Sequence, residues 1–335
     1  MPAVPSTQQL TGWVRDDYGL ELLDVDRVGH GADVAADLWR AVAADGAAYA
    51  VKLSGGGTPA GDLVTSHLAA RGIVGVLAPL PTRPGGFVAD HLGRRLTVTP
   101  WAVAERALDV DLTDAHWRAF GELLGATHGT DVTGDLAAAL PCDDLTHDAI
   151  TEQVRATIAR LAIPPADETA EAVRQAWWDA TDRIAALSHH ASLLSGALRP
   201  ITHEHVVCHG DPHVGNLLVG ENGEVWLVDW DDAVLAPREC DLMFVLGGVL
   251  AFAPVGDDHR TAFFAGYGDV DIDPRLVAYY LCTRALDDVS GWTAQAADPR
   301  DADRDRALDI VRGILSPPGL VDVALSAVAD LRRGW

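Results

Sequence analysis

Hydrophobic and polar positions alternate in short runs over the first hundred residues, a pattern typical of strands that bury one face. The pair Asp45-Gly46 lies between two of these runs and indicates a hairpin turn, and Gly93 joins two later runs. A segment rich in glycine and proline then leads into an expected helix over 62–71. The expected strands cover residues 20–28, 34–43, 47–53, 86–92 and 95–99. The pattern therefore predicts a small β-rich lobe that ends near residue 100.

Beyond residue 100 the apolar positions recur at helical spacing. Residues 167–198 carry an apolar stripe in alternating steps of four and three, which predicts one long helix. The longest apolar run, 242–255, is interrupted by glycines and is too short to span a bilayer, so it indicates a buried helix. Further helices are expected over 114–128, 305–315 and 320–331. We therefore expect an α+β fold of two lobes, a β-rich one over 1–100 and a larger α-helical one over 101–335.

Composition narrows the possible partners. The chain has 335 residues, 25 Lys+Arg against 49 Asp+Glu, and a net charge of −24. This charge argues against binding to nucleic acid or to an anionic membrane, and it is compatible with small cationic ligands and metal ions. Four separated cysteines without a CxxC pair, together with no visible signal peptide, predict a reduced, cytoplasmic chain without a structural zinc site. The sequence carries no signal for an oligomeric state.

One β-hairpin interrupts the helical half. Two short expected strands, 216–219 and 224–228, flank Asn222-Gly223, a strong turn signal. Asp211 precedes the first strand, Asn216 begins it, and Asp229 follows the second strand. Because a hairpin brings its two ends together, two carboxylates and one amide oxygen are expected at one edge of a small sheet.

These three side chains are the oxygen donors that kinase-type phosphoryl transfer uses. Magnesium bound with a nucleotide takes hard oxygen ligands, which Asn216 and Asp229 can supply. Asp211 is then free to accept the proton of a hydroxyl group. A surface hairpin with acidic ends is the alternative interpretation, and the ordered spacing of the whole set disfavours it.

Lys52 is the only lysine in a chain with 24 arginines. It lies in the apolar run Ala48-Tyr49-Ala50-Val51-Lys52-Leu53, where its ammonium needs an anion or must reach solvent. A compact ammonium suits phosphate oxygens in a way that a guanidinium does not. We therefore expect Lys52 to contact phosphates.

With these motifs the chain resembles the aminoglycoside phosphotransferase family, whose fold is protein-kinase-like. The resemblance covers about residues 24–288 and is sharpest at AYAVKL and over 209–244. The segment DWDDAVLAPRECDLMF, from Asp229 to Phe244, and the length of the chain are most similar to the spectinomycin phosphotransferase branch. Kinases of choline, homoserine and other metabolites share the generic motif.

The resemblance implies a role for each matching residue. Asp211 would be the catalytic base, and Asn216 and Asp229 would bind Mg²⁺. Lys52 would contact the phosphates of ATP. The remaining nucleotide-binding residues implied are Gly29 and Gly31 over the phosphates, and Thr99 and Trp101 at an interlobe hinge that binds adenine.

The chain departs from protein kinases at the partner of the strand lysine. Protein kinases pair this lysine with a helix glutamate. The helix expected after Lys52 contains no glutamate, and Asp62 is its only carboxylate. Asp62 is therefore our candidate partner of Lys52, with a first-turn aspartate that stabilises the helix dipole as the alternative.

Surplus acidic residues surround the motif. Residues 204–241 hold nine acidic residues and one basic residue, a balance of −8. Such a surface would attract a cationic acceptor, and an aromatic ring beside carboxylates can bind ammonium groups. The candidate substrate residues are His213, Asp231, Asp232, Asp287, Asp288 and Trp292. A loop-bracing role for His213 and a solvated helix face for Asp287-Asp288 are the alternatives.

Together the residues and the resemblance predict an ATP- and Mg²⁺-dependent kinase of a small cationic acceptor. The expected acceptor is a hydroxyl of an aminocyclitol or aminoglycoside antibiotic, with spectinomycin first, so that the antibiotic is inactivated. A kinase of another small metabolite (an amino alcohol, amino acid or sugar) is one alternative. A non-catalytic nucleotide-binding protein is another, which the presence of lysine, base and metal ligands disfavours. The glycine pattern at Gly29 and Gly31 is not the full glycine-rich loop of protein kinases. Both ATP and GTP therefore stay open as phosphate donors.

Overall fold

The computed structural model describes residues 4–29, 36–250 and 252–333, and the chain forms two compact units. The first unit lies within 1–141, 206–235 and 262–268, and the second within 142–205, 236–261 and 269–335. The lobe boundary predicted at residue 100 coincides with the end of the last strand of the first sheet, whereas the first unit continues to residue 141. The predicted boundary stays a prediction.

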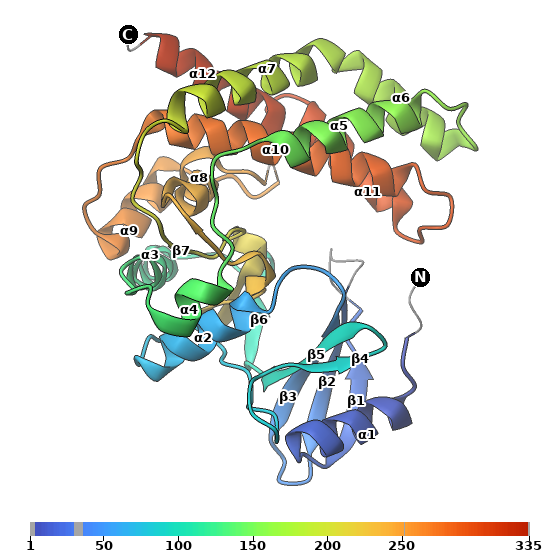
Figure 1. The fold of residues 1–335 in the computed structure, drawn as a ribbon, viewed down its shortest axis with the longest axis vertical. Coiled ribbons are helices and arrows are strands. Elements are labelled where there is room, and N and C mark those ends of the chain that lie inside the picture. The colour runs from blue at the N-terminus through green and yellow to red at the C-terminus, as the bar shows by residue number, and fades with distance from the viewer. Residues whose placement is uncertain (1–3, 30–35, 251, 334–335) are drawn as a thin grey trace. The chain divides into compact units, whose positions relative to one another are not determined.

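The first unit is built on a five-stranded antiparallel sheet with the strand order β1-β2-β3-β5-β4 (Figure 1). Helix α1 (Thr7–Tyr18) packs Leu10 and Val14 against sheet residues such as Val51 and Val98. The strands are β1 (Leu22–Arg27), β2 (Ala36–Ala43), β3 (Ala48–Ser54), β4 (Ala89–His91) and β5 (Arg94–Pro100). The expected strands are confirmed, and β3 puts Lys52 in the middle of the sheet.

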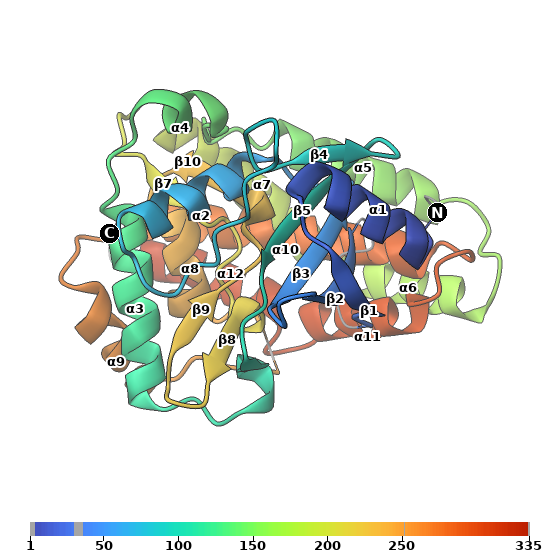
Figure 2. The same cartoon turned by 90° about the horizontal axis from the view of Figure 1, so that it is seen from below.

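A second, three-stranded sheet in this unit carries the predicted hairpin, with the strand order β6-β8-β9. Helix α3 lies beside that hairpin (Figure 2). The further helices and strands in this part of the chain are α2 (Ala60–Ala70), β6 (Ala104–Arg106), α3 (Asp114–His128), α4 (Gly134–Ala139), β7 (Val206–Cys208), β8 (Leu217–Gly220), β9 (Val225–Leu227) and β10 (Val234–Ala236).

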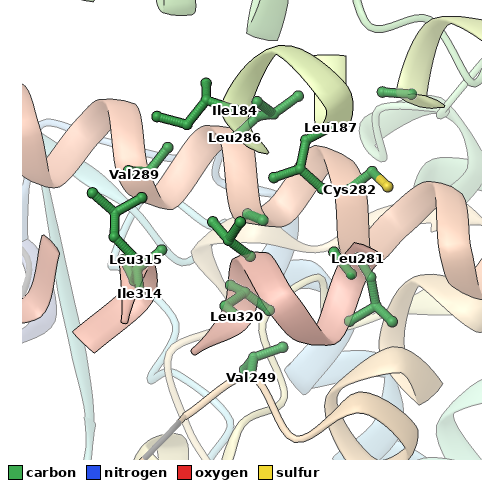
Figure 3. Close-up of a cluster of buried hydrophobic side chains, with 14 of the residues drawn as sticks. Ile184, Leu187, Val249, Leu281, Cys282, Leu286, Val289, Ile314, Leu315 and Leu320 are labelled. Atoms are coloured by element: carbon green, nitrogen blue, oxygen red, sulfur yellow. The ribbon is translucent and has the colours of Figure 1, made fainter. Parts of the chain in front are cut away.

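The second unit is helical, and α10 is its central helix. Cys282, Leu286 and Val289 of α10 pack with Ile184 and Leu187 of α7 in one apolar cluster (Figure 3). Helix α9 (Asp257–Tyr267) begins in this unit and ends in the first. The other helices are α5 (Asp148–Leu161), α6 (Glu168–Asp179), α7 (Thr181–Leu198), α8 (Glu239–Gly247), α10 (Pro274–Ala296), α11 (Arg304–Leu315) and α12 (Leu320–Arg333). A sheet-containing unit and a helical unit confirm the predicted α+β class.

Two expected helices are corrected by the structure. The long helix over 167–198 is two helices, α6 and α7, which meet at Ala180. The apolar stripe continues across the break because both helices face the same core, so the stripe reports the buried face and not an unbroken backbone. The apolar run 242–255 is helical only to Gly247, because Gly248 adopts a left-handed conformation (φ 64°) that ends α8.

The stretch from Arg304 to Arg333 is long and apolar enough to cross a membrane by length and composition alone. In the structure it is two helices, α11 and α12, which a turn after Ser316 separates. Val311 and Val321, one from each helix, are buried in the core of the second unit. Its apolar residues thus serve helix packing.

Helices α3 and α9 approach each other closely at Gly121. An added Cβ there would lie 2.0 Å from the carbonyl oxygen of Phe263. We expect Gly121→Ala to lower the free energy of unfolding by about 1–3 kcal/mol, because the two helices must separate. Urea denaturation followed by circular dichroism measures this change.

Gly196 in α7 is the matched control. It is exposed, and an added Cβ would meet no atom within 4 Å. Gly196→Ala should be as stable as the wild type or up to about 1 kcal/mol more stable, since alanine has the higher helix propensity. Equal denaturation midpoints for the two variants would contradict the close approach of α3 and α9.

Candidate active site

The hairpin brings together the residues that its spacing predicts. Strands β8 and β9 pair in the register Leu217↔Leu227 and Val219↔Val225. One step beyond, the Val228 N–H donates to the carbonyl oxygen of Asn216 at 3.0 Å. Asn216 and Asp229 therefore flank the open end of one hairpin, as the sequence indicates.

The loop that holds Asp211 is fastened to this hairpin by a buried imidazole. Nδ1 of His209 accepts a hydrogen bond from the Asp211 N–H at 3.1 Å, and its Nε2 lies 3.0 Å from the Val228 carbonyl oxygen. The first bond makes Nδ1 an acceptor, so Nε2 carries the proton and donates to Val228. The ring also packs on the indole of Trp230, with centroids 4.6 Å apart. His209 thus fixes where the Asp211 loop meets the end of β9.

The Asp211 side chain is oriented by its neighbours and is 18% exposed. The Asn216 amide nitrogen donates to the Asp211 carbonyl oxygen at 2.8 Å and lies 3.3 Å from its Oδ2. Nε2 of His213 lies 3.4 Å from the same Oδ2. These contacts bring the predicted base and one predicted metal ligand into direct contact.

Lys52 joins the five-stranded sheet to the hairpin. Its Nζ lies 2.6 Å from Oδ1 of Asp229 and 3.1 Å from Oδ2 of Asp231, and its side chain is 23% exposed. Burial alone would lower the Lys52 pKa, but the two carboxylates outweigh it and raise the pKa above its ordinary value. Burial would likewise raise the Asp229 pKa, but the ammonium of Lys52 holds it below its ordinary value. Both groups are therefore charged at neutral pH.

Asp229 has an unusual backbone conformation. Its φ of 67° and ψ of 60° put it in the left-handed region, at a cost of about 1–2 kcal/mol for a residue with a side chain. Aspartate is among the few residues that visit this region. The conformation turns the chain out of β9 into the short helical turn Trp230–Asp232.

The structure describes no ion pair between Asp62 and Lys52, so the role of Asp62 as helix partner stays a prediction. The described ion pairs of Lys52 are with Asp229 and Asp231. Burial, and then the charge of Asp231, raise the pKa of Asp62 to about 6, against the opposing effect of Lys52 and Arg95. The charge of Lys52 thus lowers the Asp62 pKa, although the described ion pairs of Lys52 do not include Asp62.

The residues predicted to bind the nucleotide base and phosphates lie along the sheet. Thr99 pairs with Ala50 in the β3–β5 ladder. The Trp101 N–H donates to the Ala48 carbonyl oxygen at 3.0 Å, so this amide is used within the sheet. Gly29 is exposed two residues after the end of β1. Gly31 lies outside the described residues.

The predicted substrate residues fall into both units. In the first, Asp231 binds Lys52, and Asp232 is exposed in the next position. In the second, all three lie on α10: Asp287 is exposed, Asp288 forms an ion pair with Arg284 at 2.8 Å, and Trp292 packs partly buried against the core. Sequence reasoning missed Ser54 and Arg95, which contact Asp231. The available signal was the run of three glycines directly after β3, which indicates a close approach of another part of the chain.

The donor set at the hairpin fits a divalent cation. The carboxylate of Asp229 and the amide oxygen of Asn216 are hard oxygen ligands. Both hydrogen bonds that the Asn216 side chain makes use its nitrogen, so no described residue donates to its Oδ1. The Asp229 side chain is 43% exposed and is reachable from solvent.

The raised pKa of Asp62 makes a prediction about stability. Its folded pKa of about 6 lies above the unfolded value of 3.8, so the unfolded chain loses this proton first as the pH rises. Folded-state stability from this group is therefore complete below about pH 4 and is lost between about pH 4 and 6. We expect Asp62→Asn to be about 1–3 kcal/mol more stable than the wild type at pH 8, with no such gain at about pH 4.

Urea denaturation at both pH values measures this difference. Asp24→Asn is the control, since it removes the same charge from an exposed position of β1. A stability gain of Asp62→Asn that is equal at both pH values would contradict the raised pKa of this carboxyl.

Comparison with known proteins agrees with this geometry. The sequence profile described as "Phosphotransferase enzyme family" matches residues 30–280, most of the chain. None of the curated protein sequences compared with the chain matches it.

Solved structures share the fold over nearly the whole chain. Spectinomycin phosphotransferase in complex with ADP and spectinomycin is 23% identical, with a TM-score of 0.86 over 97% of this chain and 99% of that one. Amicoumacin kinase in complex with AMP-PNP, Ca²⁺ and Ami is 17% identical, with a TM-score of 0.61 over 94% of this chain and 95% of that one. Macrolide 2'-phosphotransferase from Brachybacterium faecium is 16% identical, with a TM-score of 0.54 over 93% and 98%. At these identities the likeness concerns the fold. Because the family profile covers most of the sequence, the chain belongs to the phosphotransferase enzyme family, as its motifs indicate.

Proposed function

We propose that the chain transfers the γ-phosphate of ATP to a hydroxyl group of a cationic aminocyclitol or aminoglycoside antibiotic in the cytoplasm, and that spectinomycin is its acceptor. Phosphorylation would inactivate the antibiotic. The observation that carries the proposal is the cluster of Asp211, Asn216 and Asp229 at the open end of one hairpin, with Lys52 bound to Asp229 at 2.6 Å.

Each residue of this cluster has a separate task. Asp211 accepts the proton of the acceptor hydroxyl as the hydroxyl oxygen bonds to the γ-phosphorus and the bond to the leaving ADP oxygen breaks. Lys52 contributes a positive charge for the phosphate oxygens. Asn216 and Asp229 would hold Mg²⁺, which supplies charge neutralisation at the phosphates. Asn216 also donates to Asp211, and so keeps the base oriented.

Charge and fold likeness support the choice of acceptor. The chain carries a net charge of −24, and residues 204–241 around the hairpin contribute −8 of it. A multiply charged amino sugar is attracted to such a surface, whereas a neutral sugar gains nothing from it. Among the similar structures, spectinomycin phosphotransferase shares the fold with a TM-score of 0.86 and holds ADP and spectinomycin.

The base is tested by Asp211→Asn. We expect this variant to lose about 10²–10⁴-fold in kcat, because the hydroxyl proton has no acceptor, while the affinity for ATP stays unchanged. Coupled detection of ADP measures the rate, and isothermal titration with a non-hydrolysable ATP analogue measures binding. Wild-type turnover in Asp211→Asn would remove Asp211 as the base.

The acceptor is tested by a panel. The protein is incubated with MgATP or MgGTP and with spectinomycin, other aminoglycosides, amino alcohols, amino acids or neutral sugars, and nucleoside diphosphate release is followed. We expect spectinomycin with ATP to give the largest stimulation, and mass spectrometry of the product to show one added phosphate. Stimulation by an amino alcohol, amino acid or sugar instead would identify a metabolite kinase, and nucleotide binding without release for any acceptor would indicate a non-catalytic protein.

A further inference from the structure

The ammonium of Lys52 has two carboxylate partners on one short loop. Asp229 lies at 2.6 Å and Asp231, two residues later, at 3.1 Å. Asp62, the one carboxylate on the helix that follows β3, is not among its described partners. Lys52 is thus held from the turn that follows β9 and not from α2.

Asp231 is itself fixed from the sheet side. The Ser54 hydroxyl donates to its Oδ2 at 3.2 Å, and the Arg95 guanidinium lies 3.8 Å from the same atom. The Thr58 N–H donates to the carbonyl oxygen of Asp231 at 3.1 Å. Its side chain is 30% exposed. Ser54 and Arg95 therefore contact this carboxylate besides Lys52, and Thr58 holds the backbone of the same residue.

The loop after β3, residues 55–59, is shaped to receive Asp231. Gly57 has a φ of +60°, and a Cβ there would lie 2.6 Å from the Asp231 Cβ and 2.7 Å from its carbonyl oxygen. Arg95 donates to the Gly57 carbonyl oxygen at 3.2 Å and also to that of Gly56. Glycine is needed for both the backbone conformation and the close approach. The loop and Asp231 form one packed element beside Lys52.

The two carboxylates on Lys52 do not have equivalent tasks. Asp229 is the candidate ligand of the divalent cation, and a carboxylate that binds a cation attracts a second positive charge less strongly. Asp231 is not a candidate metal ligand, so its ion pair with Lys52 does not compete with the cation. We propose that Asp231 is the positioning residue of Lys52, in the place that a helix glutamate takes in protein kinases. The inference rests on the proposed function only for the role of Lys52 toward ATP.

This assignment differs from the acceptor-binding role that the sequence indicates for Asp231. Oδ2 of the carboxylate already receives Lys52, Ser54 and Arg95. A carboxylate oxygen with three partners on the sheet side is oriented toward the nucleotide-binding strand. Removal of the Asp231 carboxylate should therefore change the kinetics with ATP and leave the KM for the acceptor unchanged.

Because Lys52 is the only lysine, its environment can be read without any activity assay. The purified protein is acylated briefly with a small amine-reactive ester, and mass spectrometry compares acylation of Lys52 with that of the N-terminal amine. We expect Lys52 to react roughly threefold to tenfold faster in Asp231→Asn than in the wild type, because one of its two ion pairs is gone. Asp231→Glu should restore slow acylation in part, and Ser54→Ala should give an intermediate rate.

Asp24→Asn is the control for charge, since it removes one exposed carboxylate from β1. Its acylation ratio should equal that of the wild type. Thermal unfolding of each variant identifies any that do not fold, and Ser54→Ala keeps the test available in that case because it leaves all charges in place. An unchanged acylation ratio in folded Asp231→Asn would overturn the proposal.

Kinetics provide the second readout. In Asp231→Asn we expect kcat/KM for ATP to fall about 10–100-fold while the KM for the acceptor stays unchanged, since a misplaced lysine affects only the phosphates. A raised KM for the acceptor with unchanged ATP kinetics would assign Asp231 to acceptor binding and overturn the proposal. Failure to phosphorylate any acceptor would contradict the proposed function alone, because the acylation ratio tests Asp231 independently.

Discussion

The candidate site depends on one ammonium group and the two carboxylates that bind it. Lys52 projects from the middle strand of a five-stranded sheet, and Asp229 and Asp231 belong to the turn after β9, with Asp229 177 residues later in the sequence than Lys52. Its partial burial makes the ammonium costly without counterions, so the loop must lie against the strand. This ion-pair cluster fixes the distance between the lysine and the hairpin that carries Asn216, and the hydrogen bonds of Asn216 extend the order to Asp211.

Negative charge has two different uses in this molecule. Most of the 49 acidic side chains keep the surface strongly anionic, which suits solubility and attraction of cations. At the site, however, the carboxylates have specific partners: Asp229 and Asp231 hold Lys52, while Asp62 has a pKa near 6 because burial disfavours its charge. Neighbouring aspartates are thus distinguished by their environment, and their roles follow from burial and partners more than from residue type.

The sequence is most informative where the signals are local. Alternation, turn residues and the spacing of Asp211, Asn216 and Asp229 predict the sheet and the hairpin because each depends on neighbours a few residues away. The partner of Lys52 could not be predicted, since it depends on how the loop after β3 packs on a distant turn. Helix α10 was missed for another reason: most of its residues are buried, and its polar residues Arg284, Asp287 and Asp288 form only a narrow stripe, so the helical period is weak.

The discontinuous first unit has a consequence for biosynthesis. Its five-stranded sheet is complete by Pro100, but the segment that holds the hairpin and the partners of Lys52 ends at residue 235, and the part of α9 beside Gly121 lies within 262–268. A ribosome must therefore release nearly four fifths of the chain before the first unit can close, with helices of the second unit emerging in between. Folding of this kind has a high contact order and is slow, and it exposes apolar sheet surface while synthesis continues. Chaperone dependence and sensitivity to translation rate are the expected cellular costs of this chain order.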